Sequence, residues 1–204
     1  MAKELTAEIF YEKGVHIIRL GNLGRINDGY NITVAKQPEG TLRGFGLKKE
    51  HFDLVASLDP TVTDREFSPM EQALLLTLAR ENALAFVKDD DDLAGFNMVP
   101  CSRETITLVE ALEDGFRLRV NEGELFTISE MGYRFVPLIE RNRSVGEIAA
   151  IVKQNMLSDP DDREIIDAAV QDQGRSFDSF LAEEAFFFIR EMTNSGALTF
   201  EPRA

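Results

Sequence analysis

Apolar and polar positions alternate over short stretches in the front part of the chain. Val15 to Leu20 and Tyr30 to Ala35 alternate or favour β-branched residues, and glycine, asparagine and aspartate lie between them. This pattern predicts two strands joined as a hairpin. The glycine-bearing segments Gly21 to Gly24 and Gly40 to Gly46 match no phosphate-binding motif, and they are interpreted as turns.

Two helices and a further strand are predicted next. Apolar residues recur at helical spacing from Leu47 to Leu58. Ser68 before Pro69 is typical of a capped helix start, and we expect this helix to continue through Glu81. A strand over residues 82–86 would follow it.

The back part of the chain predicts a meander followed by helices. Strand patterns cover residues 105–112, 116–120 and 125–129, and turn residues separate them. A short helix is expected over 130–139. A second helix begins at Ser144, because Ser144 and Glu147 have the spacing of a capping box. The last helix, Phe180 to Asn194, ends before a strand over 197–200.

The last helix has one face suited to a protein core. At 100° per residue, one arc contains five apolar side chains, those of Leu181, Ala185, Phe188, Ile189 and Met192. Phe180 and Phe187 fall outside this arc, beside Glu183 and Arg190. They either pack under the front part of the chain or form an apolar wall for a ligand.

The two halves of the sequence resemble each other. Aligning 83–86 with 197–200 also aligns Leu74, Leu75 and Leu78 with Phe188, Ile189 and Met192. Each half would then end in a long helix, a tight turn and a strand. Two copies of one winged-helix plan would explain this, as would the general similarity of amphipathic helices that precede strands.

These elements predict an α+β fold in two domains. Lys88 to Gly95 contains consecutive aspartates and is interpreted as a linker. We expect an accessory α+β domain over 1–95, which would be a degenerate second winged helix if the repeat is genuine. A winged-helix-like domain of three strands and three helices is expected over 96–204.

Composition narrows the classes of partner. The chain has 204 residues and a net charge of -14, and it has no local basic stripe. This acidic surface disfavours nucleic acid as a binding partner. Its single cysteine, Cys101, excludes an intrachain disulfide and favours a reducing compartment. The amino terminus lacks a signal peptide pattern, and no stretch is long enough for a membrane span, so a cytoplasmic location is expected.

Candidate catalytic chemistry is sparse in this sequence. His16 and His51 lack a second ligand at helical spacing. Cys101 follows Pro100 in a stretch interpreted as a linker, and it has no basic cluster that would activate it. Asp159, Asp161 and Asp162 form an acidic cluster without the spacing of a calcium loop, which is interpreted as a solvated face or as a cation site. The expectation is a noncatalytic protein with no cofactor and no catalytic metal.

Three segments carry a resemblance to a known family. They run from Gly123 to Ile139, from Arg143 to Val152 with the motif Ser-Val-Gly-Glu-Ile, and from Phe180 to Leu198 with Gly-Ala-Leu at its end. Together they resemble the PqqD family, the precursor-peptide recognition domains of ribosomal peptide modification pathways. The resemblance covers the carboxy-terminal half. Two departures are the missing Asp-Gly before the second helix and the long loop from Leu157 to Ser176.

The resemblance implies a peptide-binding partner protein. Members of this family hold the leader of a precursor peptide as an added strand and present it to a modifying enzyme, here expected to be metal-dependent. The residues that match the sheet edge and the helical wall are Leu125, Phe126, Thr127, Ile128, Phe180, Glu183, Phe187 and Arg190. The alternatives are a winged-helix regulator, a protein-assembly factor, or an accessory subunit of a metalloenzyme.

Overall fold

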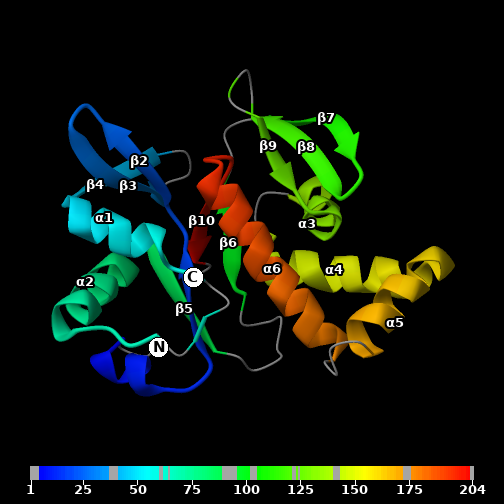
Figure 1. Cartoon of the computed structure of the whole chain (residues 1–204), viewed down its shortest axis with the longest axis horizontal. Helices are drawn as coiled ribbons and strands as arrows, with labels where there is room; N and C mark the ends of the chain where they lie inside the picture. The colour runs from blue at the N-terminus through cyan, green and yellow to red at the C-terminus, as the bar shows by residue number, and fades with distance from the viewer. Residues whose placement is uncertain are drawn as a thin grey trace.

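The fold is α+β, with helices set around several small antiparallel sheets (Figure 1). The structure is a computed structural model. It describes residues 5–36, 41–59, 62–63, 65–88, 96–101, 105–120, 123, 125–139, 143–171 and 176–202. The linker expected at Lys88 to Gly95 lies outside the described residues, except that Lys88 is the last residue of a strand.

The front half contains five strands and two α-helices within the described residues. In chain order the elements are η1 Ala7–Tyr11, β1 Val15–Arg19, β2 Asn22–Ile26, β3 Gly29–Lys36, β4 Thr41–Leu47, α1 Lys49–Ala56, α2 Pro69–Arg80 and β5 Leu84–Lys88. The predicted cap of α2 is confirmed, because Ser68 and Glu71 form a complete capping box.

The back half contains the predicted meander and four α-helices in its described part. The elements are β6 Met98–Cys101, β7 Ile106–Leu112, β8 Gly115–Val120, β9 Leu125–Ile128, α3 Glu130–Phe135, η3 Val136–Leu138, α4 Val145–Ser158, η4 Pro160–Asp162, α5 Arg163–Gln171, α6 Phe177–Asn194 and β10 Thr199–Pro202. The capping box of Ser144 and Glu147 is confirmed at the start of α4.

Both halves follow the same order of elements. After η1 in the front half, each has one strand, then a three-stranded antiparallel meander, then helices, and ends in a strand that pairs antiparallel with the first. In the front half β5 returns to β1 around the meander β2-β3-β4. In the back half β10 returns to β6 around β7-β8-β9. The resemblance predicted from the last helix and strand therefore extends to the whole topology.

The turn after the long helix is also similar in the two halves. Asn82 follows α2 with φ 59°, and Gly196 follows α6 with φ 73°. Both are left-handed conformations, which glycine and asparagine adopt most readily. The turns place Ala83 and Ala197 in the core at the same point of each half.

Three sequence predictions about strands are wrong. β1 does not form a hairpin with β3, because β1 pairs with β5 while β3 pairs with β2 and β4. The glycine segments interpreted as turns contain β2 and β4, and Gly24, Gly44 and Gly46 lie within these strands. Cys101 ends the strand β6 rather than lying in a linker.

The main hydrophobic core is built from both halves. Ile18, Leu20 and Val87 of the front half belong to the same cluster as Phe135, Phe188 and other residues of the back half. Leu20 also joins the two small central sheets, since its N–H donates to the Ala83 carbonyl at 2.9 Å and its carbonyl accepts from Phe200 N–H at 2.9 Å. A second, smaller core lies under the front meander.

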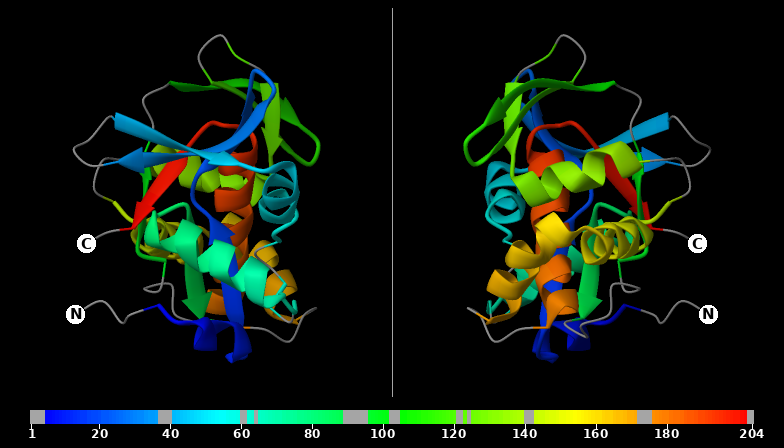
Figure 2. Two further views of the ribbon diagram at one scale, coloured as in Figure 1. Left: turned by 90° about the vertical axis from the view of Figure 1, so that its left-hand side faces the viewer. Right: turned by 90° about the vertical axis from the view of Figure 1, so that its right-hand side faces the viewer.

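Helix α6 occupies the middle of the molecule. It runs between the two meanders in Figure 1, and both side views keep it at the centre (Figure 2). All five residues of its predicted core face are buried. It also contacts β1 and β2 of the front half. The carboxy-terminal end of α6 is therefore enclosed by elements from both halves.

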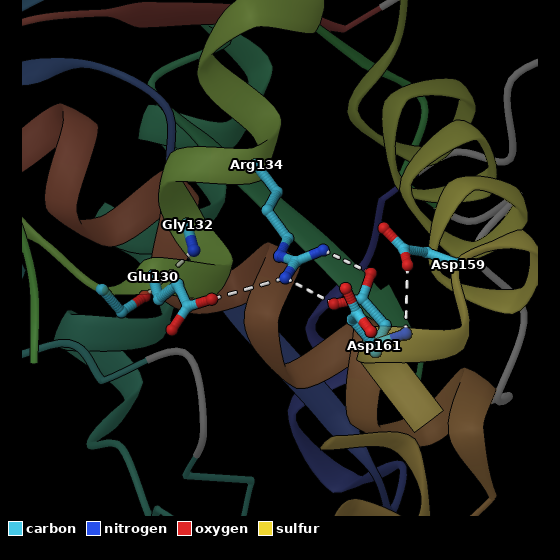
Figure 3. A network of polar contacts seen from close by, with 7 residues as sticks. Glu130, Gly132, Arg134, Asp159 and Asp161 are labelled. Atoms are coloured by element: carbon cyan, nitrogen blue, oxygen red, sulfur yellow. Dashed lines mark hydrogen bonds and ion pairs between the residues drawn. The ribbon is translucent and has the colours of Figure 1, made fainter. Parts of the chain in front are cut away.

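The acidic cluster after α4 joins two helices. The Asp162 side chain is buried, and its two oxygens accept hydrogen bonds of 2.7 Å each from the Arg134 guanidinium on α3 (Figure 3). Asp159 accepts from the Asp161 N–H. The interpretation as a solvated face is therefore wrong for Asp162. The adjoining helix α5 occupies much of the segment expected to be a loop.

Candidate functional site

A cleft of about 580 Å³ opens at the carboxy-terminal end of α6. Four elements surround it: the end of β1, the residues after α1, the strand β9 and the last turns of α6. Its lining residues are Ile18, Arg19, Ala56, Ser57, Leu58, Asp59, Phe126, Thr127, Ile189, Arg190, Glu191, Thr193, Asn194 and Ser195. This volume is in the range of about 300–1,000 Å³ that is usual for ligand pockets.

One wall of the cleft is the edge of the back meander. β9 pairs with β8 on one side, and its other edge has no strand partner among the described residues. Immediately after β9, the Ser129 N–H lies on the side of the Glu191 carboxylate of α6 and lowers the pKa of that group. Because backbone groups two residues apart face the same edge of a strand, Thr127 turns its N–H and C=O toward α6 as well.

The opposite wall contains a partly buried arginine from the front half. Arg19 Nη2 donates to Thr193 Oγ1 at 3.3 Å and to Asn194 Oδ1. Its Nε is buried without a hydrogen-bond partner in the described part of the chain. Burial lowers the pKa of Arg19 to about 10. The guanidinium is thus desolvated on a wall of the cleft, with no carboxylate among the described residues paired to it.

Arg190 connects α6 to the segment that follows α1. Its Nη1 lies 3.6 Å from Asp59 Oδ2, and its guanidinium carbon lies 4.7 Å from the centre of the Phe187 ring. An ion pair and a cation–π contact together fix the position of the side chain. This arrangement places Arg190 at the boundary between the cleft and the half-buried face of α6.

Glu191 faces the cleft from the last turns of α6. Its Oε2 is buried and has no hydrogen-bond partner within the described residues. Burial raises the pKa of Glu191, while the Arg190 charge and the Ser129 N–H lower it. About two helical turns before Glu191, burial raises the pKa of Glu184 to about 7, and the charges of Glu183 and Glu191 add to this effect.

The cleft brings together part of the predicted site. Phe126, Thr127 and Arg190 line it. Leu125 is exposed at the start of the same strand, whereas the Ile128 side chain is fully buried in the core.

The remaining predicted residues lie along α6, outside the cleft lining. Phe187 is beneath Arg190, and Glu183 is half-buried on the same helix. Phe180 stacks on Phe177 with their ring centres 6.1 Å apart, and it packs against the core. Neither Phe180 nor Phe187 is fully buried. Because a helix rises about 1.5 Å per residue, Phe180 is about 15 Å from Arg190 along the axis.

Sequence reasoning did not identify the cleft residues of the front half. Arg19 and Asp59 are separated from α6 by more than one hundred residues, and the Arg19–Thr193 contact spans 174 positions. A charged residue at the end of a mostly apolar strand, Val15–Arg19, was the available signal. For Thr193 and Asn194, the sequence pattern indicates only that they lie at the end of the helix.

The two histidines and the cysteine that were weighed as candidate catalytic residues each lie close to another side chain. His16 is buried with its ring centre 4.4 Å from that of Phe186, and His51 Nε2 lies 3.8 Å from Glu50. Cys101 Sγ lies 3.8 Å from a Glu201 carboxylate oxygen. No group of three or more potential metal ligands occurs among the described residues. Within the same part of the chain, no helix is long and apolar enough to cross a membrane.

Comparisons with protein-family models, with curated proteins and with solved structures find no match to this chain.

Proposed function

We propose that this protein is a noncatalytic partner that holds the leader of a ribosomally made precursor peptide and presents it to a modifying enzyme in the cytoplasm. The observation that carries the proposal is the free edge of β9 beside a cleft wall formed by α6. The sequence resemblance of the back half to the PqqD family supports the same edge, because the leader would bind there at the strand over residues 125–128. The back half would then be the winged-helix-like unit, and the front half a degenerate copy of it.

Strand addition requires main-chain donors and acceptors that are not already used. Thr127 is exposed, and its backbone groups face α6 rather than β8. A guest in extended conformation would pair with this edge and place alternate side chains in the cleft. The half-buried side chains of Leu58 and Phe126 would give apolar contacts to those side chains.

A titration followed by nuclear magnetic resonance tests the proposal. The probes are synthetic peptides that cover the amino-terminal part of each short open reading frame found next to the gene of this protein. We expect amide shifts at residues 125–128 and 189–195, and also at Arg19 and residues 56–59, because all of these border the cleft. Shifts confined to η1 and α2, or the absence of binding to every probe, would contradict it.

Two substitutions at Thr127 separate main-chain pairing from side-chain contact. Thr127→Pro removes the outward N–H and adds a ring at the edge, while leaving the β8 side of the strand unchanged. We expect it to weaken binding of a shifting probe by about tenfold or more, since a hydrogen bond is lost and the added strand is blocked. Thr127→Ala keeps the N–H and is the matched control, with an expected change of less than about twofold.

A further inference from the structure

The donors of Arg19 are only partly used within the protein. Both of its hydrogen bonds come from Nη2, which donates to Thr193 and Asn194 on α6. Nε and Nη1 make no hydrogen bond to the described residues. A half-buried guanidinium in this state has lost part of its hydration without gaining a charged partner, which is unfavourable. Nη2 also anchors the group, so its orientation is fixed before any ligand binds.

Among the described residues, neither carboxylate that lines the cleft forms an ion pair with Arg19. Asp59 pairs with Arg190 across the boundary of the cleft. Glu191 has a buried Oε2 without a hydrogen-bond partner in the described part of the chain, and burial raises the pKa of this carboxyl group. The polar groups bonded to Arg19, Thr193 and Asn194, are neutral. The positive charge of Arg19 is therefore not neutralised within the described part of the cleft.

We propose that the cleft contains a subsite for an acidic side chain of the guest peptide, and that Arg19 binds this side chain. The inference rests on the proposed function, since it assumes a guest strand at the β9 edge. An aspartate or glutamate of that strand would accept a hydrogen bond from Nη1, which makes no hydrogen bond to the described residues. Charge-assisted bonds from arginine to a carboxylate are among the strongest that proteins form. The ligand is a side chain rather than a peptide terminus, because a leader continues into the segment to be modified.

The rest of the molecule limits the composition of the guest. A net charge of -14 repels a strongly acidic peptide at long range. The cleft also presents the half-buried apolar side chains of Leu58 and Phe126. We therefore expect one acidic residue flanked by apolar or β-branched residues. A basic guest residue at this position would face an unneutralised guanidinium and would bind poorly.

Selection from a displayed library tests the subsite. The probe is a library of random peptides of about 12 residues, enough to cover an edge strand, selected against the full chain and against its variants. We expect aspartate or glutamate to be enriched at one position with the unsubstituted chain. Replacing that residue by its amide in a selected peptide should weaken binding by about tenfold, the usual effect of losing a hydrogen bond to a charged group.

Matched variants assign the preference to Arg19. With Arg19→Met we expect the acidic preference to disappear, and the acid and amide forms of the peptide should bind within about twofold of each other. Arg19→Lys should keep a reduced preference, and it serves in place of Arg19→Met if that variant does not fold. Arg117→Gln is the charge control, because Arg117 lies on β8, pairs with Glu110 and does not line the cleft.

The outcomes distinguish the two proposals. Enriched peptides that lose binding with Thr127→Pro but show no acidic position would overturn the Arg19 subsite and leave strand addition intact. The same would follow if Arg19→Met kept the acidic preference. Enriched peptides that are insensitive to Thr127→Pro would overturn binding at the β9 edge, and with it the subsite. Failure to enrich any peptide would count against both.

Discussion

At the scale of single residues, the half-buried carboxyl groups of α6 make stability depend on pH. Burial raises the pKa of Glu184 from 4.5 to about 7, and the nearby charges of Glu183 and Glu191 act in the same direction. The folded state therefore binds the Glu184 proton more tightly than the unfolded state does. This group makes the folded protein less stable as the pH rises from 4.5 toward about 7, and the loss persists at higher pH.

Glu184→Gln should remove this pH-dependent loss. Above about pH 7 we expect the variant to melt at a higher temperature than the unsubstituted chain, and below pH 4.5 the two should melt at nearly the same temperature. Thermal denaturation across this range provides the measurement. Glu164→Gln is the control, because Glu164 is exposed on α5 and should change the melting temperature little. A variant that is less stable than the chain at high pH would contradict the argument.

Single residues also show why the site was only partly predictable. The edge strand and Arg190 were identified because strand alternation and helical periodicity are local patterns. Arg19 could not be assigned, since its role depends on β1 lying against α6, a contact between distant parts of the chain. The sequence indicates that residue 19 is charged, but not that it becomes half-buried beside Thr193.

At the scale of elements, Arg134 and Asp162 fix the position of the helices below the back meander. Asp162 is buried at 6% exposure, and it accepts two hydrogen bonds from Arg134 (Figure 3). Asp162→Asn would replace one acceptor by a donor that faces the guanidinium. We expect the free energy of unfolding to fall by about 2–3 kcal/mol, as measured by chemical denaturation.

Asp161→Asn is the matched control for this prediction. The Asp161 side chain is exposed, and it is the backbone N–H of this residue that bonds to Asp159. We expect a change of less than about 0.5 kcal/mol. Equal effects of the two substitutions would show that the Arg134–Asp162 pair contributes little to stability.

Elements with strong local signals were predicted well, and elements defined by distant partners were not. The capped starts of α2 and α4, the back meander and the core face of α6 follow from caps, turns and periodicity. β4 was missed because Gly44 and Gly46 weaken a strand pattern, although pairing with β3 stabilises it. α5 was missed among acidic residues, although Ile165 and Ile166 on one face were an available signal.

At the scale of the whole molecule, the repeated topology explains why the cleft draws on both halves. In each half the last strand returns to the first, and Leu20 joins the two resulting sheets through its own N–H and C=O. The boundary expected between residues 95 and 96 therefore crosses a shared core. The position of β1, which carries Arg19, depends on this junction.

Leu20→Ala tests whether the two halves fold as one cooperative unit. The Leu20 side chain is fully buried, so truncation should lower the free energy of unfolding by about 2–5 kcal/mol. If the junction couples the halves, hydrogen exchange should accelerate in both β5 and β10, because Leu20 bonds to Ala83, the residue before β5, and to Phe200 of β10. Leu42→Ala is the control, since Leu42 is 56% exposed on β4 and its truncation should leave exchange at both strands unchanged. Acceleration in β5 alone would indicate that the front half unfolds independently, in which case Arg19 would not be held in place by the back half.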